Sequence, residues 1–247
     1  KPHRGHLYTW ASTDRVVYTY AREGTGDHPA QILANFQGTL VADGGSSFNQ
    51  AASKPGVVRA GCWAHARRKF WDARDTDPRH VHHALETIRE VFQLERRFRE
   101  LSPDDRARQR RAVTWPILQA LRAWCQALTL SEPPKSPLAK AANYVLRQWH
   151  TLVVFIDDGD IPAHNNLSEL LLRQPVVGRK NWMFAGSEGG AQTAATWFSL
   201  IGSCMVNAID PWLYLSDVLP RLNSWPAKRV LELEPAAWRA QRLSQRA

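Results

Sequence analysis

Two carboxylates in this 247-residue chain occupy positions where the sequence predicts the ends of secondary-structure elements. Asp43 directly follows the short apolar run GTLVA, residues 38–42, and opens an Asp-Gly-Gly turn. Strand ends are where α/β proteins commonly present catalytic groups. An Asp-Gly pair is also a common structural turn. The sequence around Asp43 is therefore compatible with a catalytic role and with a purely structural one.

Glu169 lies about one turn into a predicted helix that Asn165 or Asn166 caps. Locally it is compatible with a capping box with Asn166 or an i,i+4 ion pair with Arg173. Together, Glu169 and Asp43 are also compatible with a two-metal site for phosphoryl transfer. That chemistry needs carboxylates from different elements to hold two ions ~3.5–4 Å apart. One ion activates the attacking hydroxyl or water, and the other stabilises the leaving 3′ oxygen.

Cys62 and His65 are spaced i,i+3 on a predicted helix that begins near residue 60. A zinc site needs about four ligands, and no second pair of Cys or His at ligand spacing stands nearby. This favours a packing or hydrogen-bonding role. The other cysteines, Cys125 and Cys204, are too widely spaced for a disulfide framework, which favours a reducing cytoplasm.

The charge balance indicates a polyanionic partner. Lys and Arg number 32 against 23 Asp and Glu, which gives a formal charge of +9 and a pI near 9.9. Nucleic acid ranks ahead of an acidic membrane surface, because no apolar run approaches the ~20 residues that span a bilayer. A secretory signal is also lacking at the start of the sequence, so we expect a cytoplasmic protein without membrane attachment.

Two compact basic clusters lie close in sequence to the two carboxylates. A single cluster is typical of a solvated face, but the pairing with Asp43 and Glu169 favours contacts to DNA phosphates. A glycine-rich stretch, AGSEGG, could cradle a phosphate on backbone N–H groups, although it does not match a Walker A loop. The clusters are Arg67-Arg68-Lys69 and Arg179-Lys180-Asn181.

The elements that position these residues predict an α/β fold. A β-hairpin over residues 5–12 and 15–22 precedes a short helix over 28–36, which Asp27 caps, and then the strand 38–42. Residues 76–150 contain helical patterns and no convincing strand. After the Glu169 helix come a basic turn and glycine-rich loop over 178–190, a long helix over 191–207 and two short helices. We therefore expect a mixed sheet flanked by helices, interrupted by an all-helical insertion and followed by a small helical tail.

Three blocks of this sequence resemble the insertion-sequence-66 family of transposases. VADGGSSFNQ followed by AGCWAHARRKFWDA resembles the block around the family's second catalytic aspartate. The segment from HNNLSELLLRQPVVGRKNWMFAGSEGG to DVL resembles its glutamate block, and SWPAKRVLELEPAAW resembles its C-terminal end. The resemblance covers nearly the whole chain.

The resemblance implies an RNase H-like catalytic domain of the DDE type that cleaves and transfers DNA strands with Mg²⁺ or Mn²⁺. Asp43 would be the second acid and Glu169 the third, and Cys62 and His65 match the family's Cys-x-x-His. The implied partners are terminal inverted repeats and target DNA, with Arg173 among the DNA-binding residues and a homo-oligomer assembled on DNA. The implied divisions are 1–75 and 151–207 for the RNase H-like domain, 76–150 for the insertion and 208–247 for the tail.

Two departures from the family pattern affect the expected activity. RNase H-like domains open with three antiparallel strands, but only two precede the first predicted helix, and the family's Asp-Glu-Thr-Pro motif is absent. His164 stands where the family usually has Asp before Asn-Asn. We therefore expect an N-terminally truncated domain that is inactive by itself. The alternatives are a non-catalytic DNA-binding remnant of a transposase and an RNase H-like nuclease of another pathway.

Overall fold

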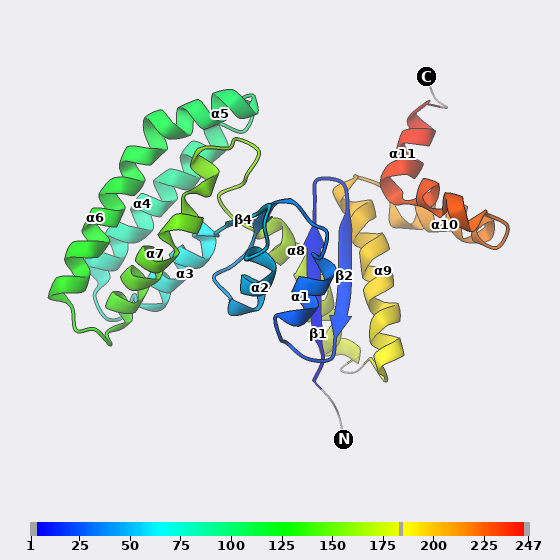
Figure 1. Cartoon of the computed structure of the whole chain (residues 1–247), viewed down its shortest axis with the longest axis horizontal. Coiled ribbons are helices and arrows are strands. Elements are labelled where there is room, and N and C mark those ends of the chain that lie inside the picture. The colour runs from blue at the N-terminus through cyan, green and yellow to red at the C-terminus, as the bar shows by residue number, and fades with distance from the viewer. Residues whose placement is uncertain (1–3, 183–184, 245–247) are drawn as a thin grey trace. The chain divides into compact units, whose positions relative to one another are not determined.

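The chain divides into two compact units (Figure 1). The computed structural model describes residues 4–182 and 185–244. The first unit combines the N-terminal segment up to Gly24 with the chain from Asn166 onward, and the second consists of Thr25–Asn165. The expected domain boundaries at residues 75, 150 and 207 stay predictions.

The first unit begins with the predicted hairpin. Strands β1 (His6–Ala11) and β2 (Val16–Ala21) pair antiparallel with Ala11 opposite Val16. The connecting turn closes through a hydrogen bond from the Ser12 N–H to the Arg15 carbonyl, at 2.8 Å. The β-branched and aromatic residues of both runs account for this pairing, and the predicted hairpin is confirmed.

Helix α9 (Glu188–Val206) runs along β2, as Figure 1 shows. Polar side chains four residues apart at its C-terminal end bind backbone groups two residues apart on the hairpin. Four helical residues rise ~6 Å and two strand residues ~6.6–6.8 Å, so the two repeats match. We call these side chains the edge row. Its pairs are Ser199 with the Tyr18 N–H (2.8 Å), Ser203 with the Val16 N–H (2.9 Å) and C=O (3.0 Å), and Asn207 with the Asp14 C=O (2.6 Å).

Helix α8 (Asn166–Trp182) carries Glu169 and begins where the sequence predicts, but it continues through Pro175. Proline has no N–H for the carbonyl of Leu171, four residues earlier. The Tyr18 hydroxyl donates to that carbonyl instead, at 2.8 Å. The basic turn predicted over residues 178–181 is therefore wrong, because these residues are helical. Met183 and Phe184, in the predicted loop, lie outside the described residues.

The remaining elements of the first unit are helical, as predicted for the tail. α10 (Pro211–Leu222), the 3₁₀ segment η4 (Ala227–Leu233) and α11 (Pro235–Ser244) follow α9. They share a small core with the end of α9, made of Cys204, Ile209, Tyr214, Val218, Leu233 and Trp238. Helix α9 begins at Glu188, three residues before the predicted start, because Ser187 caps it by accepting from the Gly190 N–H at 3.0 Å.

The second unit begins with the α/β part that holds Asp43. Its elements are α1 (Asp27–Ile32), β3 (Gly38–Val41), the 3₁₀ turn η1 (Ser46–Phe48), α2 (Asn49–Ala52) and β4 (Val57–Ala60). Strands β3 and β4 pair parallel. The predicted capping of the first helix by Asp27 is wrong, since Asp27 is itself helical and Gly26 stands at the cap. That helix also ends at Ile32, before the predicted residue 36.

The α/β class is confirmed, but the strands are distributed differently from the expectation. Within the described residues the four strands form two separate two-stranded sheets, β1–β2 in the first unit and β3–β4 in the second. The sequence predicted one mixed sheet. Part of the difference comes from β4, a strand of four residues. It pairs parallel with β3, so that Val57 stands opposite Gly38, a residue 19 positions earlier in the sequence.

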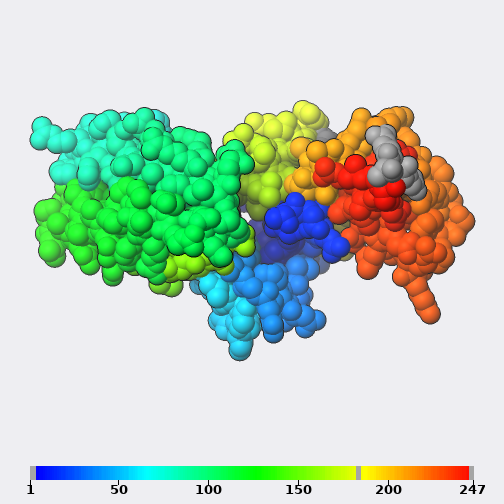
Figure 2. Space-filling model, turned by 90° about the horizontal axis from the view of Figure 1, so that it is seen from above, coloured from blue at the N-terminus to red at the C-terminus, as the bar shows by residue number. Residues whose placement is uncertain are grey.

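The rest of the second unit is helical, which confirms the predicted strandless block. A shared apolar core joins these helices, which form one continuous mass in the space-filling view (Figure 2). The elements are α3 (Trp63–Asp72), α4 (Pro78–Arg97), α5 (Pro103–Gln109), the π-helical turn η2 (Arg110–Thr114), α6 (Trp115–Ser131), α7 (Pro137–Leu152) and the 3₁₀ turn η3 (Val154–Ile156). Among the helices described, none has the length and apolar character to cross a bilayer.

Candidate functional site

Asp43 lies just beyond β3, in the turn that the sequence predicts. The Ala42 N–H donates to the Ala60 carbonyl at 3.0 Å, which continues the β3–β4 ladder up to this turn. The Asp43 side chain folds back, and its Oδ1 accepts from the Gly45 N–H at 3.0 Å. Its Oδ2 accepts no hydrogen bond from a residue that the structure describes. One carboxylate oxygen thus fixes the turn.

Arg59, on β4, fixes the same turn from the other side. Its Nη2 donates to the carbonyl oxygens of Asp43 (2.6 Å) and Gly45 (2.8 Å), and its Nη1 donates to Asn49 Oδ1. Burial lowers the pKa of Arg59, while the negative charge of Asp43 opposes that shift. The sequence analysis missed Arg59. The available indication of its role was the position of Arg59, a charged residue within the β-branched run VVRA.

Tyr144, on α7, is the second residue that the sequence analysis missed at this turn. Its ring lies against Gly44, where a Cβ atom would stand 2.7 Å from the Tyr144 hydroxyl oxygen. Burial raises the pKa of Tyr144, and the nearby Asp43 charge adds to that shift. Nothing in the sequence of α7 connects it to a turn about a hundred residues earlier.

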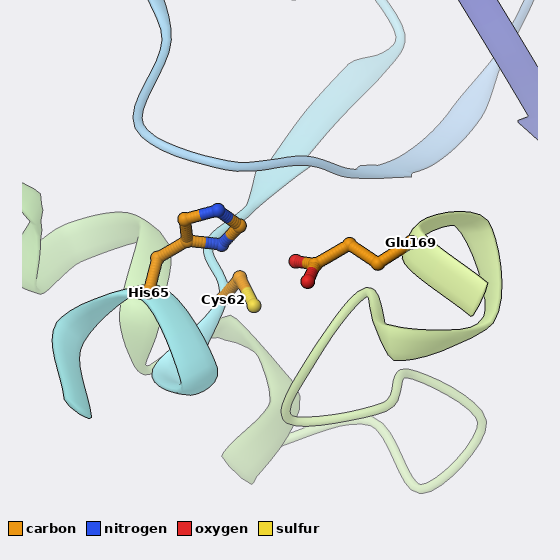
Figure 3. A group of neighbouring side chains, drawn as sticks. All are labelled: Cys62, His65 and Glu169. Atoms are coloured by element: carbon orange, nitrogen blue, oxygen red, sulfur yellow. The ribbon is translucent and has the colours of Figure 1, made fainter. Parts of the chain in front are cut away.

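Cys62 and His65 lie together at the start of α3 (Figure 3). Their potential ligand atoms are within 4.8 Å of each other. Cys62 is buried, and its Sγ accepts from the Asn165 N–H at 3.4 Å. The hydrogen-bonding role predicted for Cys62 is therefore present in the second unit. It also gives Asn165, a predicted supporting residue, a defined partner.

The junction around Cys62 is held by backbone and indole hydrogen bonds. The Gly61 N–H donates to the Thr151 carbonyl at 2.8 Å, and the Trp63 N–H donates to the Ala163 carbonyl at 3.0 Å. The Trp63 indole Nε1 donates to the Leu152 carbonyl at 2.8 Å. These contacts fix the start of α3 against the C-terminal end of α7.

Glu169 lies in the first turn of α8 (Figure 3). Asn166 is the first residue of that helix. The Glu169 side chain is half-buried. Glu169 belongs to the first unit, whereas Asp43, Cys62 and His65 belong to the second. The expected convergence of Asp43 and Glu169 on shared metal ions stays a prediction.

The two basic clusters are exposed on helices. Arg67, Arg68 and Lys69 are consecutive on α3, and the Lys69 ammonium lies 5.7 Å from the centroid of the Tyr144 ring. On α8 the predicted DNA-binding residues Arg173, Arg179, Lys180 and Asn181 are all exposed. Arg173 and Lys180 are seven residues apart and therefore share one helix face. Exposure leaves both clusters accessible to a polyanion.

The glycine-rich stretch AGSEGG offers fewer free backbone donors to a phosphate than the sequence suggested. The Ser187 side chain occupies the Gly190 N–H, one of the backbone donors that a phosphate would use. The rest of the stretch begins α9. We therefore place no phosphate at this loop.

Family models cover most of the chain. The model described as "Transposase IS66 family" matches residues 1–193, and the one described as "IS66 C-terminal element" matches residues 199–236. The chain belongs to the IS66 transposase family. Asp43, Glu169 and both basic clusters fall inside the first match, and the edge row and α10 fall inside the second.

Curated relatives of this IS66 chain come from Sinorhizobium fredii (strain NBRC 101917 / NGR234). The uncharacterized protein y4hP is 32% identical over 95% of this chain and 47% of its own length. The uncharacterized protein y4qI is 33% identical over 92% of this chain and 44% of its own length. The chain thus spans about half the length of these relatives. No solved structure matches it.

Proposed function

We propose that this chain is the catalytic part of an IS66 transposase that cleaves and joins DNA strands with divalent metal ions. An RNase H-like fold belongs to the same proposal. The observation that carries it is the Asp43 turn. An aspartate directly after a parallel strand is fixed through Oδ1 and through Arg59.

The chemistry of this turn fits a hard divalent cation. Mg²⁺ and Mn²⁺ prefer carboxylate oxygens and demand well-defined geometry, which a fixed aspartate supplies. Asp43 and Glu169 would hold the ions, which when bound activate the attacking oxygen and stabilise the leaving 3′ oxygen. The exposed cations Arg67, Arg68 and Lys69 would bind the DNA backbone near Asp43, and Arg173, Arg179 and Lys180 with Asn181 would do so near Glu169.

Affinity cleavage of the protein tests whether Asp43 and Glu169 share a metal site. Fe²⁺ is loaded in place of Mg²⁺ on the 247-residue chain, and ascorbate with peroxide generates radicals that cut the nearby backbone. We expect cuts at both the end of β3 and the start of α8. Asp43→Asn should suppress the cuts at both places, and so should Glu169→Gln, because each variant removes one ligand of the shared site.

Other results would contradict this function. Cuts at one element alone would refute the shared metal site. DNA binding without any Asp43-dependent cutting would favour the non-catalytic remnant. With transposon-end DNA added, metal-dependent cleavage without strand joining would favour an RNase H-like nuclease of another pathway. Arg108→Gln, at an exposed arginine on α5, is a matched control that should change neither readout.

A further inference from the structure

The Asp43 turn is in contact with a large side chain from the helical part of its unit. Tyr144 comes from α7, and its ring stands over Gly44. A Cβ atom at Gly44 would lie 2.7 Å from the Tyr144 hydroxyl oxygen, 3.0 Å from Cε2 and 3.2 Å from Cζ. Contacts under 3.0 Å are too close for a real Cβ atom, so an alanine at position 44 would force the Tyr144 ring to shift.

The backbone conformation of Gly44 does not explain the glycine. The glycines with positive φ in the described chain are Gly38, Gly56 and Gly186. An alanine would therefore fit the backbone at position 44, and it would collide there with the Tyr144 side chain. Burial raises the pKa of Tyr144, and a polar contact with the backbone of Gly44 opposes that shift. Tyr144 thus holds the residue that follows Asp43 by shape and by a polar contact.

Lys69 adds a charge close to the same ring. Its ammonium lies 5.7 Å from the centroid of the Tyr144 ring, within the range of a cation–π contact. The same ring thus contacts an exposed cation of α3 and the backbone beside Asp43. Tyr144 of α7 and Arg59 of β4 both contact the turn directly.

We propose that Tyr144 is a positioning residue for the Asp43 carboxylate, so that the helical segment sets the geometry of the metal-binding turn. This inference rests on the proposed function, because it assumes that Asp43 is a metal ligand. Tyr144 acts through Gly44, and Arg59 holds the carbonyl oxygens on the opposite side of the turn. An insertion that appears remote in sequence is thereby part of the site.

The test measures the affinity of the 247-residue chain for Mn²⁺. The electron paramagnetic resonance signal of free Mn²⁺ reports how much of the ion is bound. Tyr144→Phe keeps the ring and removes the hydroxyl, and we expect Mn²⁺ binding three- to tenfold weaker with an unchanged thermal midpoint. Hydrogen exchange of the peptide over residues 40–48 should become faster in the same variant. Tyr20→Phe, at a half-buried tyrosine of β2, is the matched control and should change neither quantity.

A second pair of variants tests the close approach itself. Gly44→Ala should weaken Mn²⁺ binding in the native background, because the added methyl group displaces the Tyr144 ring. In a Tyr144→Ala background the same substitution should have little further effect, because the obstructing atoms are gone. Independent, additive losses from the two substitutions would overturn the proposal.

The remaining outcomes separate this inference from the proposed function. If Asp43→Asn weakens Mn²⁺ binding but Tyr144→Phe does not, Tyr144 has no positioning role and the metal assignment stands. If Asp43→Asn leaves Mn²⁺ binding unchanged, the metal assignment and the positioning role both fall. If Tyr144→Phe speeds exchange at the turn without altering Mn²⁺ affinity, its role is structural and the proposal is overturned.

Discussion

The Tyr18 hydroxyl donates a hydrogen bond to the carbonyl oxygen of Leu171, the α8 carbonyl that Pro175 deprives of its helical partner. A buried carbonyl without a donor costs about 1–3 kcal/mol. A side chain from β2 removes that cost, so α8 continues past the proline. Leu171 follows Glu169 by two residues. The hydrogen bond to its carbonyl therefore anchors the part of α8 that carries Glu169 to the hairpin.

Removing this hydroxyl should destabilise the first unit. We expect Tyr18→Phe to lower the free energy of unfolding by about 1–2 kcal/mol, measured by urea denaturation. In a Pro175→Ala background the Leu171 carbonyl regains a backbone donor, so the same substitution should cost distinctly less. A double-mutant cycle measures that coupling. Equal costs in the two backgrounds would show that the hydroxyl does not compensate for the proline.

The edge row makes a similar prediction for the hairpin. Ser203→Ala removes the partner of both the N–H and the C=O of Val16, and we expect a loss of about 1–3 kcal/mol of stability. Hydrogen exchange at the Val16 amide should be faster in this variant. Ser216→Ala, at an exposed serine of α10, is the control and should stay within about 0.5 kcal/mol of the native chain.

The helical segment contains a buried ion pair with a defined energetic role. Arg110 is 2% exposed, and it donates to Glu95 through Nε (2.9 Å) and Nη2 (2.6 Å). Arg110→Met would leave Glu95 unpaired, and we expect a loss of about 3–5 kcal/mol in chemical denaturation. The neighbouring Arg111 pairs with Asp157 at the surface, so Arg111→Met should cost about 0–1 kcal/mol. Similar losses from both variants would contradict this assignment.

Buried thiols predict how stability depends on pH. Burial raises the pKa of Cys125 from 9.0 to about 12, and burial together with the Asp210 charge raises that of Cys204 to about 11. Above pH 9 the unfolded thiols lose their protons while the folded ones keep them, so the unfolded state is favoured. The stabilisation is thus complete below pH 9 and is lost as pH rises toward 12.

The free energy of unfolding should fall less steeply with pH between pH 9 and 11 in Cys125→Ala than in the native chain. This holds whatever the substitution does to stability at neutral pH. An unchanged slope would contradict the assignment. Alkylation gives a second measurement. At pH 8 both thiols should react with iodoacetamide only after the chain is unfolded, because only the thiolate is nucleophilic.

The basic cluster on α3 predicts a salt-dependent contact with DNA. Arg67→Gln combined with Arg68→Gln should weaken binding of duplex DNA of any sequence. It should also reduce the slope of log K against log salt by about 1.8, since each phosphate contact contributes about 0.9. Arg108→Gln, at an arginine paired with Asp105, is a control that removes one positive charge elsewhere and should leave the slope unchanged. An unaltered slope would remove α3 from the DNA-binding surface.

Local patterns predicted those elements whose structure depends on nearby residues. Alternation and β-branching predicted the hairpin, and helical periodicity predicted the strandless block. The family model agrees with the resemblance read from the motifs around Asp43 and Glu169. In each case the information lies within a short stretch of sequence.

The errors arise where distant residues decide the structure. Proline should end a helix, but Tyr18 satisfies the carbonyl that Pro175 leaves, so residues 178–181 are helical. Strand β4 has four residues, too few for a clear pattern, and it exists because β3 pairs with it. Arg59 and Tyr144 meet the Asp43 turn through the fold, which no spacing rule reveals.

The edge row also determines the direction in which the hairpin sheet can grow. Val16 and Tyr18 direct their backbone groups toward α9, where serines occupy them. Their antiparallel partners, Ala11 and Thr9, therefore direct theirs to the opposite side of β1. The serine side chains occupy the backbone groups that a neighbouring strand would bind, so no further strand can pair with β2 there. Any further strand, whether from this polypeptide or from another, must join this sheet along β1, so the hairpin is a template with one usable side.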